Sequence, residues 1–195
     1  MHARLSALLV AAGAVAALSS CGDPTAIKAR LTNFEAKHVV YSVNGSSPIL
    51  PTGIRIRTAA PVYVGPEFAF DLAVDLTDTG TVKLMTARSL ATEIQGSLNR
   101  VGLRDSPGLA FESIIDPPRD LFVYDSILVV PVGRTVLVDV FELSCQQEAL
   151  LGFNIRAKLR VDSVDIPNRA VYIHMVTNPN CGFSQLVPGG QLPKE

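Results

Sequence analysis

The chain has 195 residues, of which 48% are hydrophobic and 18% are charged, and its formal net charge is −1. This composition excludes a disordered chain, because disordered chains combine low hydrophobicity with high net charge. It also excludes a basic nucleic-acid-binding protein, since 17 Lys and Arg residues are balanced by 18 Asp and Glu residues. The length is typical of a single domain.

The N-terminus has the features of an export signal. Residues 5–18 form an unbroken run of apolar and small residues behind Arg4. These 14 residues are too few for a transmembrane helix, which needs about 20, but they fit the apolar core of a secretory signal peptide. The run ends in Leu18-Ser19-Ser20-Cys21, which resembles the lipobox of bacterial lipoproteins: an aliphatic residue, two small residues and a cysteine.

The resemblance implies that residues 1–20 are a cleaved signal peptide and that Cys21 is lipidated. The Cys21 thiolate would accept a diacylglycerol, so the protein would be held by membrane lipid, with residues 21–25 as a tether. Gly22 stands where an aspartate favours inner-membrane retention in enterobacterial lipoproteins. We therefore expect a lipid-anchored protein of the cell envelope, with the outer membrane favoured over the inner membrane.

Export suggests a disulfide between the two remaining cysteines. Cys145 and Cys181 are predicted to pair because exported proteins occupy an oxidising compartment. The closed loop of about 37 residues would stabilise the fold by about 4 kcal/mol. The alternative is a metal site that adds His38 and His174 to the two thiols, but the spacing of these residues matches no ligand pattern. We expect no metal and no cofactor.

Alternation of apolar and polar residues predicts an all-β domain. Even positions are large and apolar in Phe68–Leu76, and odd positions are apolar in Ile155–Val161, which is typical of strands with one face in a core. Residues 131–134 are predicted to form a hairpin turn. Further strands are predicted at 26–31, 37–43, 54–57, 81–85, 121–130, 135–145 and 171–175. About nine strands favour an antiparallel β-sandwich over residues 26–187, with a barrel as the alternative.

Three segments depart from this pattern. Leu90, Ile94, Leu98 and Val101 share one helical face, so residues 88–104 are predicted as either a short helix or a loop and a strand. Phe111–Ile115 is predicted as a helical turn. Residues 188–195 are rich in Pro and Gly and are predicted to be a loose tail.

Two groups of charged residues are candidates for chemistry. Asp71 and Asp75 share the polar face of a strand, but residues four apart on a strand are about 13 Å apart, too far for one Ca²⁺. We therefore expect a solvated strand face. Arg156, Lys158 and Arg160 form a basic stripe on another strand. We expect this stripe on an outer face, paired with acids such as Asp162, Asp165 or Glu142. The alternative is an interaction surface for anionic headgroups or an acidic polymer.

Two functions of different classes fit these observations. The favoured one is a non-catalytic binding or scaffold module that presents loops or a sheet edge to an envelope protein or a glycan, with no nucleic-acid partner. The alternative is an envelope hydrolase or metal-handling protein with a site built from His38, His174 and nearby acids. No nucleophile elbow and no zinc-protease motif occurs, so no catalytic residue is assigned.

Overall fold

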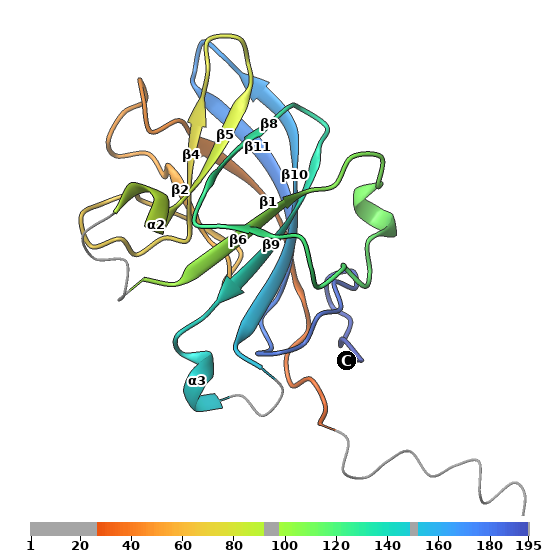
Figure 1. Ribbon diagram of the computed structural model, residues 1–195. Coiled ribbons are helices and arrows are strands. Elements are labelled where there is room, and N and C mark those ends of the chain that lie inside the picture. Colours follow the sequence, from red (N-terminus) through yellow and green to blue (C-terminus); the bar gives the residue numbers. More distant parts are fainter. Residues whose placement is uncertain (1–26, 92–97, 149–151, 195) are drawn as a thin grey trace, which may run out of the picture.

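The computed structural model describes residues 27–91, 98–148 and 152–194, and it confirms the predicted β-sandwich (Figure 1). The strands in this part of the chain are β1 (Phe34–Tyr41), β2 (Gly53–Arg55), β3 (Ala60–Val62), β4 (Leu72–Leu76), β5 (Val82–Thr86), β6 (Arg100–Asp105), β7 (Val123–Tyr124), β8 (Ile127–Val130), β9 (Thr135–Phe141), β10 (Asn154–Asp165) and β11 (Ala170–Asn178). One antiparallel sheet has the order β1-β11-β10-β9-β6-β7, and the other has the order β3-β2-β4-β5-β8. Among the described residues, no helix is long and apolar enough to cross a membrane.

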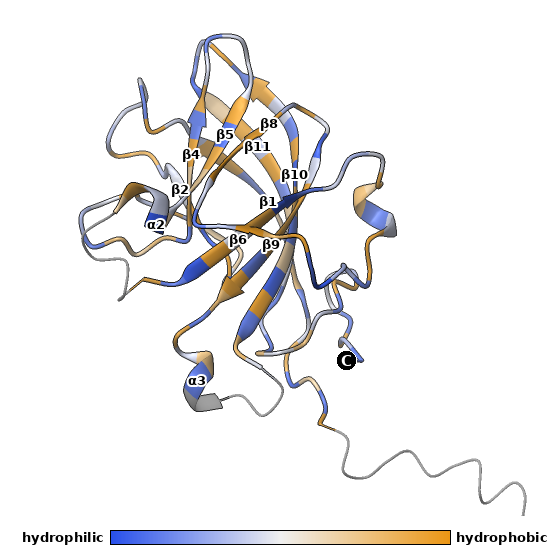
Figure 2. Ribbon diagram, viewed as in Figure 1, coloured by the Kyte–Doolittle hydropathy of each residue, from blue (hydrophilic) through white to orange (hydrophobic). Residues whose placement is uncertain are grey.

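The core lies between the two sheets and follows from the alternation of the strands. On β10, the odd-numbered residues from Ile155 to Val161 are at most 1% exposed. They meet apolar residues of the facing sheet, including Leu72, Val74 and Leu76 of β4. Figure 2 shows apolar residues concentrated along the strands, while the connecting loops are more polar. Burial of this apolar surface is the main term that holds the sheets together.

The outer face of β4 is also buried, which corrects the expectation of a solvated strand. A second apolar cluster, formed by Phe70, Ala73, Met85, Ala87, Ala91 and Leu98, covers this face. Asp71 and Asp75 are 0% and 8% exposed; Asp71 accepts hydrogen bonds from Ile56 N and Asn99, and Asp75 accepts one from the Ser42 hydroxyl. Alternation indicates which side chains share a face, but it does not show whether another segment covers that face.

The predicted hairpin at residues 131–134 is wrong, because β8 and β9 belong to different sheets. β8 pairs with β5, whereas β9 pairs with β6 and β10. The predicted strand over 121–130 is also divided, since Asp125 has a positive φ of 54° and separates β7 from β8. Both strands are apolar enough to fit the inner face of either sheet, so composition alone does not assign their partners.

The region predicted as helix or loop and strand contains both a helix and a strand. Helix α2 (Ala87–Leu90) begins where the Thr86 hydroxyl accepts a hydrogen bond from Ser89 N, and residues 100–104 belong to β6. Residues 92–97 lie outside the described residues. The predicted helical turn is confirmed as the 3₁₀ helix η2 (Phe111–Ser113).

The N-terminal end of the described chain is hydrogen-bonded to the segment after β11. No strand forms at residues 27–31, contrary to the prediction, because Arg30 N and Leu31 N donate to the Asn180 side chain, both at 3.0 Å.

The predicted disulfide between Cys145 and Cys181 is confirmed. It links helix α3 (Cys145–Glu148) to the segment that follows β11.

Candidate functional site

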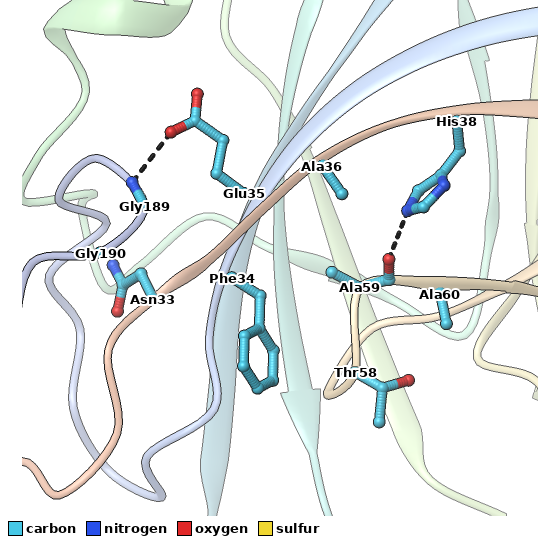
Figure 3. A pocket seen from close by; sticks show the side chains of 10 residues that line it. All are labelled: Asn33, Phe34, Glu35, Ala36, His38, Thr58, Ala59, Ala60, Gly189 and Gly190. Carbon is cyan, nitrogen blue, oxygen red and sulfur yellow. Dashed lines mark hydrogen bonds between the residues drawn. The ribbon is translucent and has the colours of Figure 1, made fainter.

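An open groove of about 530 Å³ lies beside the edge of β1, close to both ends of the described chain (Figures 1 and 3). Three separate segments line it. They are the start of β1 with the residue before it, the turn between β2 and β3, and the C-terminal segment. Their lining residues are Asn33, Phe34, Glu35, Ala36, His38, Thr58, Ala59, Ala60, Gly189 and Gly190.

The register of β1 decides which of its backbone groups face the groove. Ser42 N donates to Arg169 O at 2.9 Å, and this pair continues the register of β1 with β11. In an antiparallel ladder, every second residue pair exchanges hydrogen bonds. The even-numbered residues of β1 therefore bond to β11, and the odd-numbered residues direct their N–H and C=O groups away from β11; of these, Glu35 lines the groove.

Two hydrogen bonds cap this outward edge of β1. Asn33 N donates to Gln191 O at 3.3 Å, and Tyr41 N donates to Pro51 O at 2.8 Å. Within the described ranges, nothing bonds the outward backbone groups between the caps, which belong to Glu35, Lys37 and Val39. The edge therefore offers unpaired donors and acceptors over the length of one short extended peptide.

His38 fixes the opposite wall of the groove. Its Nε2 lies 2.6 Å from Ala59 O (Figure 3). Because a carbonyl oxygen only accepts, the imidazole must carry a hydrogen on Nε2 and donate it. Ala59 has a positive φ of 49°, a conformation that is uncommon outside glycine. The His38 hydrogen bond thus connects the Thr58–Ala60 turn to β1.

Glu35 fastens the C-terminal segment to β1. Its carboxylate accepts hydrogen bonds from Gly189 N at 2.9 Å and from His174 Nε2 at 3.0 Å. The Gly189 N–H, followed by the His174 side chain, lowers the pKa of Glu35 below its usual value. The segment predicted as a loose tail, residues 188–195, is thus hydrogen-bonded to the body here and at Gln191 within its described part, 188–194.

The structure does not bring the two predicted histidines together. His174 is opposite Lys37 in the β1–β11 register, whereas His38 is opposite Ile173, a core residue. Adjacent residues of a strand point to opposite faces, so His38 and His174 lie on opposite sides of the sheet. Among the described residues, no group of three or more His, Cys, Asp or Glu residues could hold a metal ion. Cys21 lies outside these residues.

The basic stripe on β10 is covered, not open to solvent. Lys158 is 3% exposed, and its Nζ donates to Phe111 O and Ile114 O, both at 2.8 Å. Burial lowers the pKa of Lys158. The prediction of an exposed stripe is therefore wrong for Lys158, because the segment that carries η2 lies over the outer face of the six-stranded sheet.

The two arginines of the stripe have acidic partners. Arg156 lies 3.1 Å from Asp139, and Arg160 lies 2.7 Å from Asp162 and 3.0 Å from Glu112. These ion pairs give both guanidinium groups partners within the molecule. The stripe consequently offers less positive charge to an external partner than its sequence indicates.

Asp71 is the centre of a buried polar cluster that joins the two sheets. Ile56 N donates to its carboxylate at 2.7 Å, and Asn99 Nδ2 donates to both Asp71 at 3.0 Å and Glu142 at 2.8 Å. Arg55 lies 3.7 Å from each carboxylate. Desolvation raises the pKa of Asp71. The hydrogen bonds of these acids point inward, so the cluster connects elements of the fold.

Sequence patterns missed most of the groove. The predicted strand over 37–43 omits Asn33–Ala36, and no periodicity relates β1 to the Thr58–Ala60 turn or to Gly189. The Gly189-Gly190 pair was the available signal, since glycine permits close approach of two backbones. A Cβ on Gly189 would lie 2.7 Å from the Cβ of Glu35.

Comparison with known proteins finds no relative: no protein-family model, no curated protein and no solved structure matches the chain.

Proposed function

We propose that this chain is a non-catalytic binding module, held at a membrane of the cell envelope by lipid on Cys21, which binds an extended peptide segment of another envelope protein along β1. The observation that supports it is the capped edge of β1, where the described chain gives the outward backbone groups of Glu35, Lys37 and Val39 no partner, and which begins at an open groove lined by Glu35. An extended peptide satisfies such an edge by adding a strand to the sheet.

The hydrogen bonds that the lining side chains already make favour a peptide over a glycan as the ligand of the groove. Asn33 Nδ2 donates to two backbone carbonyls, Glu35 is bound by Gly189 and His174, and His38 donates to Ala59. A glycan is recognised mainly by side-chain groups, and here Asn33, Glu35 and His38 already have internal partners, which leaves the exposed Thr58 hydroxyl. The other groups that remain are backbone donors and acceptors, which an extended peptide complements.

The position of the groove fits a lipid anchor on Cys21. Nine residues lead from Cys21 to Arg30, whose N–H is hydrogen-bonded to Asn180. Nine extended residues reach at most about 30 Å. A body anchored in this way would hold the groove close to the membrane surface, where it would meet segments of neighbouring envelope proteins.

Mass spectrometry of the purified protein tests the anchor, since an unmodified Cys21 would contradict it.

The binding proposal is tested by a photo-crosslinking residue at Thr58, which is exposed in the groove wall. We expect the full chain in its native envelope to capture a specific protein from this position. Lys37→Pro should abolish capture, because it removes an outward N–H that β11 does not use. Lys37→Ala is the matched control and should retain capture. Equal capture by both variants, or capture of a glycan alone, would contradict the proposal.

A further inference from the structure

The edge of β8 is a four-residue apolar edge that no proline, charged residue or capping segment of the described chain protects. Natural sheet edges are shielded by proline, charged residues or capping segments. β3 carries Pro61, β1 carries Glu35 and Lys37, and β7 is only two residues long, whereas β8 reads Ile-Leu-Val-Val from Ile127 to Val130. In the sheet order, β8 has β5 on one side and no strand of the described chain on the other.

Exposed apolar side chains surround this edge. A groove of about 380 Å³ runs between β8 and the segment that leads into β7. The exposed residues on and beside it are Leu121 at 73%, Val123 at 63%, Ile127 at 52% and Val129 at 57%. An apolar patch of this kind on a folded domain marks an interaction surface.

The register of β8 shows which backbone groups are free. Thr86 N donates to Ser126 O at 3.3 Å, and this pair continues the register of β5 with β8. Since hydrogen-bonded pairs alternate, Leu128 and Val130 bond to β5. Ile127 and Val129 therefore direct their N–H and C=O groups outward, and the described residues give these groups no partner.

The residues at the two ends of β8 restrict the register of any added copy. Asp125 has a positive φ of 54° and donates its N–H to Val101 O, so an added strand cannot extend past it in that direction. Pro131 has no N–H at the other end. An antiparallel second β8 satisfies all the free groups in one register, in which Ile127 of each copy is opposite Val129 of the other.

We propose that β8 pairs with β8 of a second copy of this chain, so that the two five-stranded sheets form one continuous sheet across a two-fold axis. A second copy fits because the edge is complementary to itself. The same two residues supply the donors and acceptors on both sides, and no charge on β8 opposes a like charge. Such an interface is isologous, as in most homodimers.

Site-specific crosslinking of the full chain tests this register. In a mixture of the single variants Ile127→Cys and Val129→Cys, the two new thiols would be opposite each other, within the Cα separation that a disulfide requires. We expect oxidation to join one copy of each variant. Each variant alone should give no such product, since identical residues would lie diagonally, about 8 Å apart by strand geometry, beyond disulfide reach.

Controls separate this interface from other contacts. The chain without an added cysteine shows any product that arises through Cys21. Tyr63 lies beside β3, the opposite edge strand, and is 61% exposed. The variant Tyr63→Cys should therefore not crosslink with either β8 variant. Val129→Pro removes an outward N–H without removing a bond to β5, so it should keep the melting temperature but abolish the dimer in sedimentation. Crosslinks in every combination, crosslinks to a different protein, or a wild-type chain that sediments as a monomer would each overturn the proposal.

Discussion

Asp71 and Lys158 are ionisable residues that the fold buries, and each is hydrogen-bonded to the backbone of another segment. Asp71 accepts from Ile56 N, and Lys158 donates to two carbonyls of the segment around η2. Burying a charge is costly unless it is paired and hydrogen-bonded. Both residues therefore connect separate elements of the fold, and their replacement should affect stability before it affects binding.

Asp71→Asn should change how stability depends on pH. Desolvation raises the pKa of Asp71 above its usual 3.8, so the folded state retains a proton that the unfolded chain releases. As pH rises above 3.8, the free energy of unfolding of the wild type should therefore fall relative to that of the variant. Denaturant titrations between pH 3 and 7, roughly the range of carboxylate titration, measure this. Asp120→Asn, on an exposed side chain, is the control, and a pH-independent difference would contradict the prediction.

Lys158→Met should loosen the segment around η2. It leaves Phe111 O and Ile114 O without their donor, and a buried unsatisfied group costs about 1–3 kcal/mol. We expect lower stability and faster hydrogen exchange at residues 111–115. Lys83→Met, at a partly exposed position of β5, should have little effect on either quantity. Unchanged exchange at 111–115 would show that Lys158 does not hold this segment.

At the scale of elements, the ends of the chain define the groove beside β1. The C-terminal segment caps the edge at Asn33, and the segment after β1 caps it at Tyr41. These caps leave a short edge exposed and cover the remainder. This arrangement limits uncontrolled pairing with other strands while it retains room for one peptide.

Gly189→Ala should displace the C-terminal segment from β1. A Cβ at this position would lie 2.7 Å from the Glu35 Cβ, and overpacking of this kind costs about 1–3 kcal/mol. Faster hydrogen exchange at the Asn33 amide, which bonds to Gln191, would report the displacement. Gly65→Ala is a matched control, because its nearest neighbour is the end of the flexible Glu67 side chain. Equal effects of the two variants would contradict this account.

At the scale of the whole molecule, the disulfide closes one end of the sandwich. Replacing both Cys145 and Cys181 by Ser opens a loop with a sequence separation of 36. The chain-entropy model predicts a loss of about 4 kcal/mol. Guanidinium titration should show a lower midpoint in the variant, and the oxidised wild type treated with reductant should approach the same value. A loss below about 1 kcal/mol would contradict the prediction. It would indicate that residual structure restricts the unfolded chain even without the disulfide.

The strand pattern predicted the class of fold, but not the partner of each strand. The alternation in Ile155–Val161 correctly identified a strand with one face in the core. By contrast, the apolar composition of β8 and β9 suggested a hairpin, and the chain instead crosses between sheets there. Strand pairing depends on which inner face each segment covers, and this is a property of the assembled core.

The sequence by itself determined the β-sandwich class, the pairing of Cys145 with Cys181 and the expectation of a lipid-anchoring N-terminus. These follow from local patterns, since residue type, spacing and compartment are sufficient to indicate them. Only the tertiary structure decided that Lys158 and Asp71 are buried, that His38 and His174 lie on opposite faces, and that β1 and β8 have edges to which no other described strand pairs. Each of these depends on contacts between segments far apart in the chain, and residue periodicity carries no information about which segments meet.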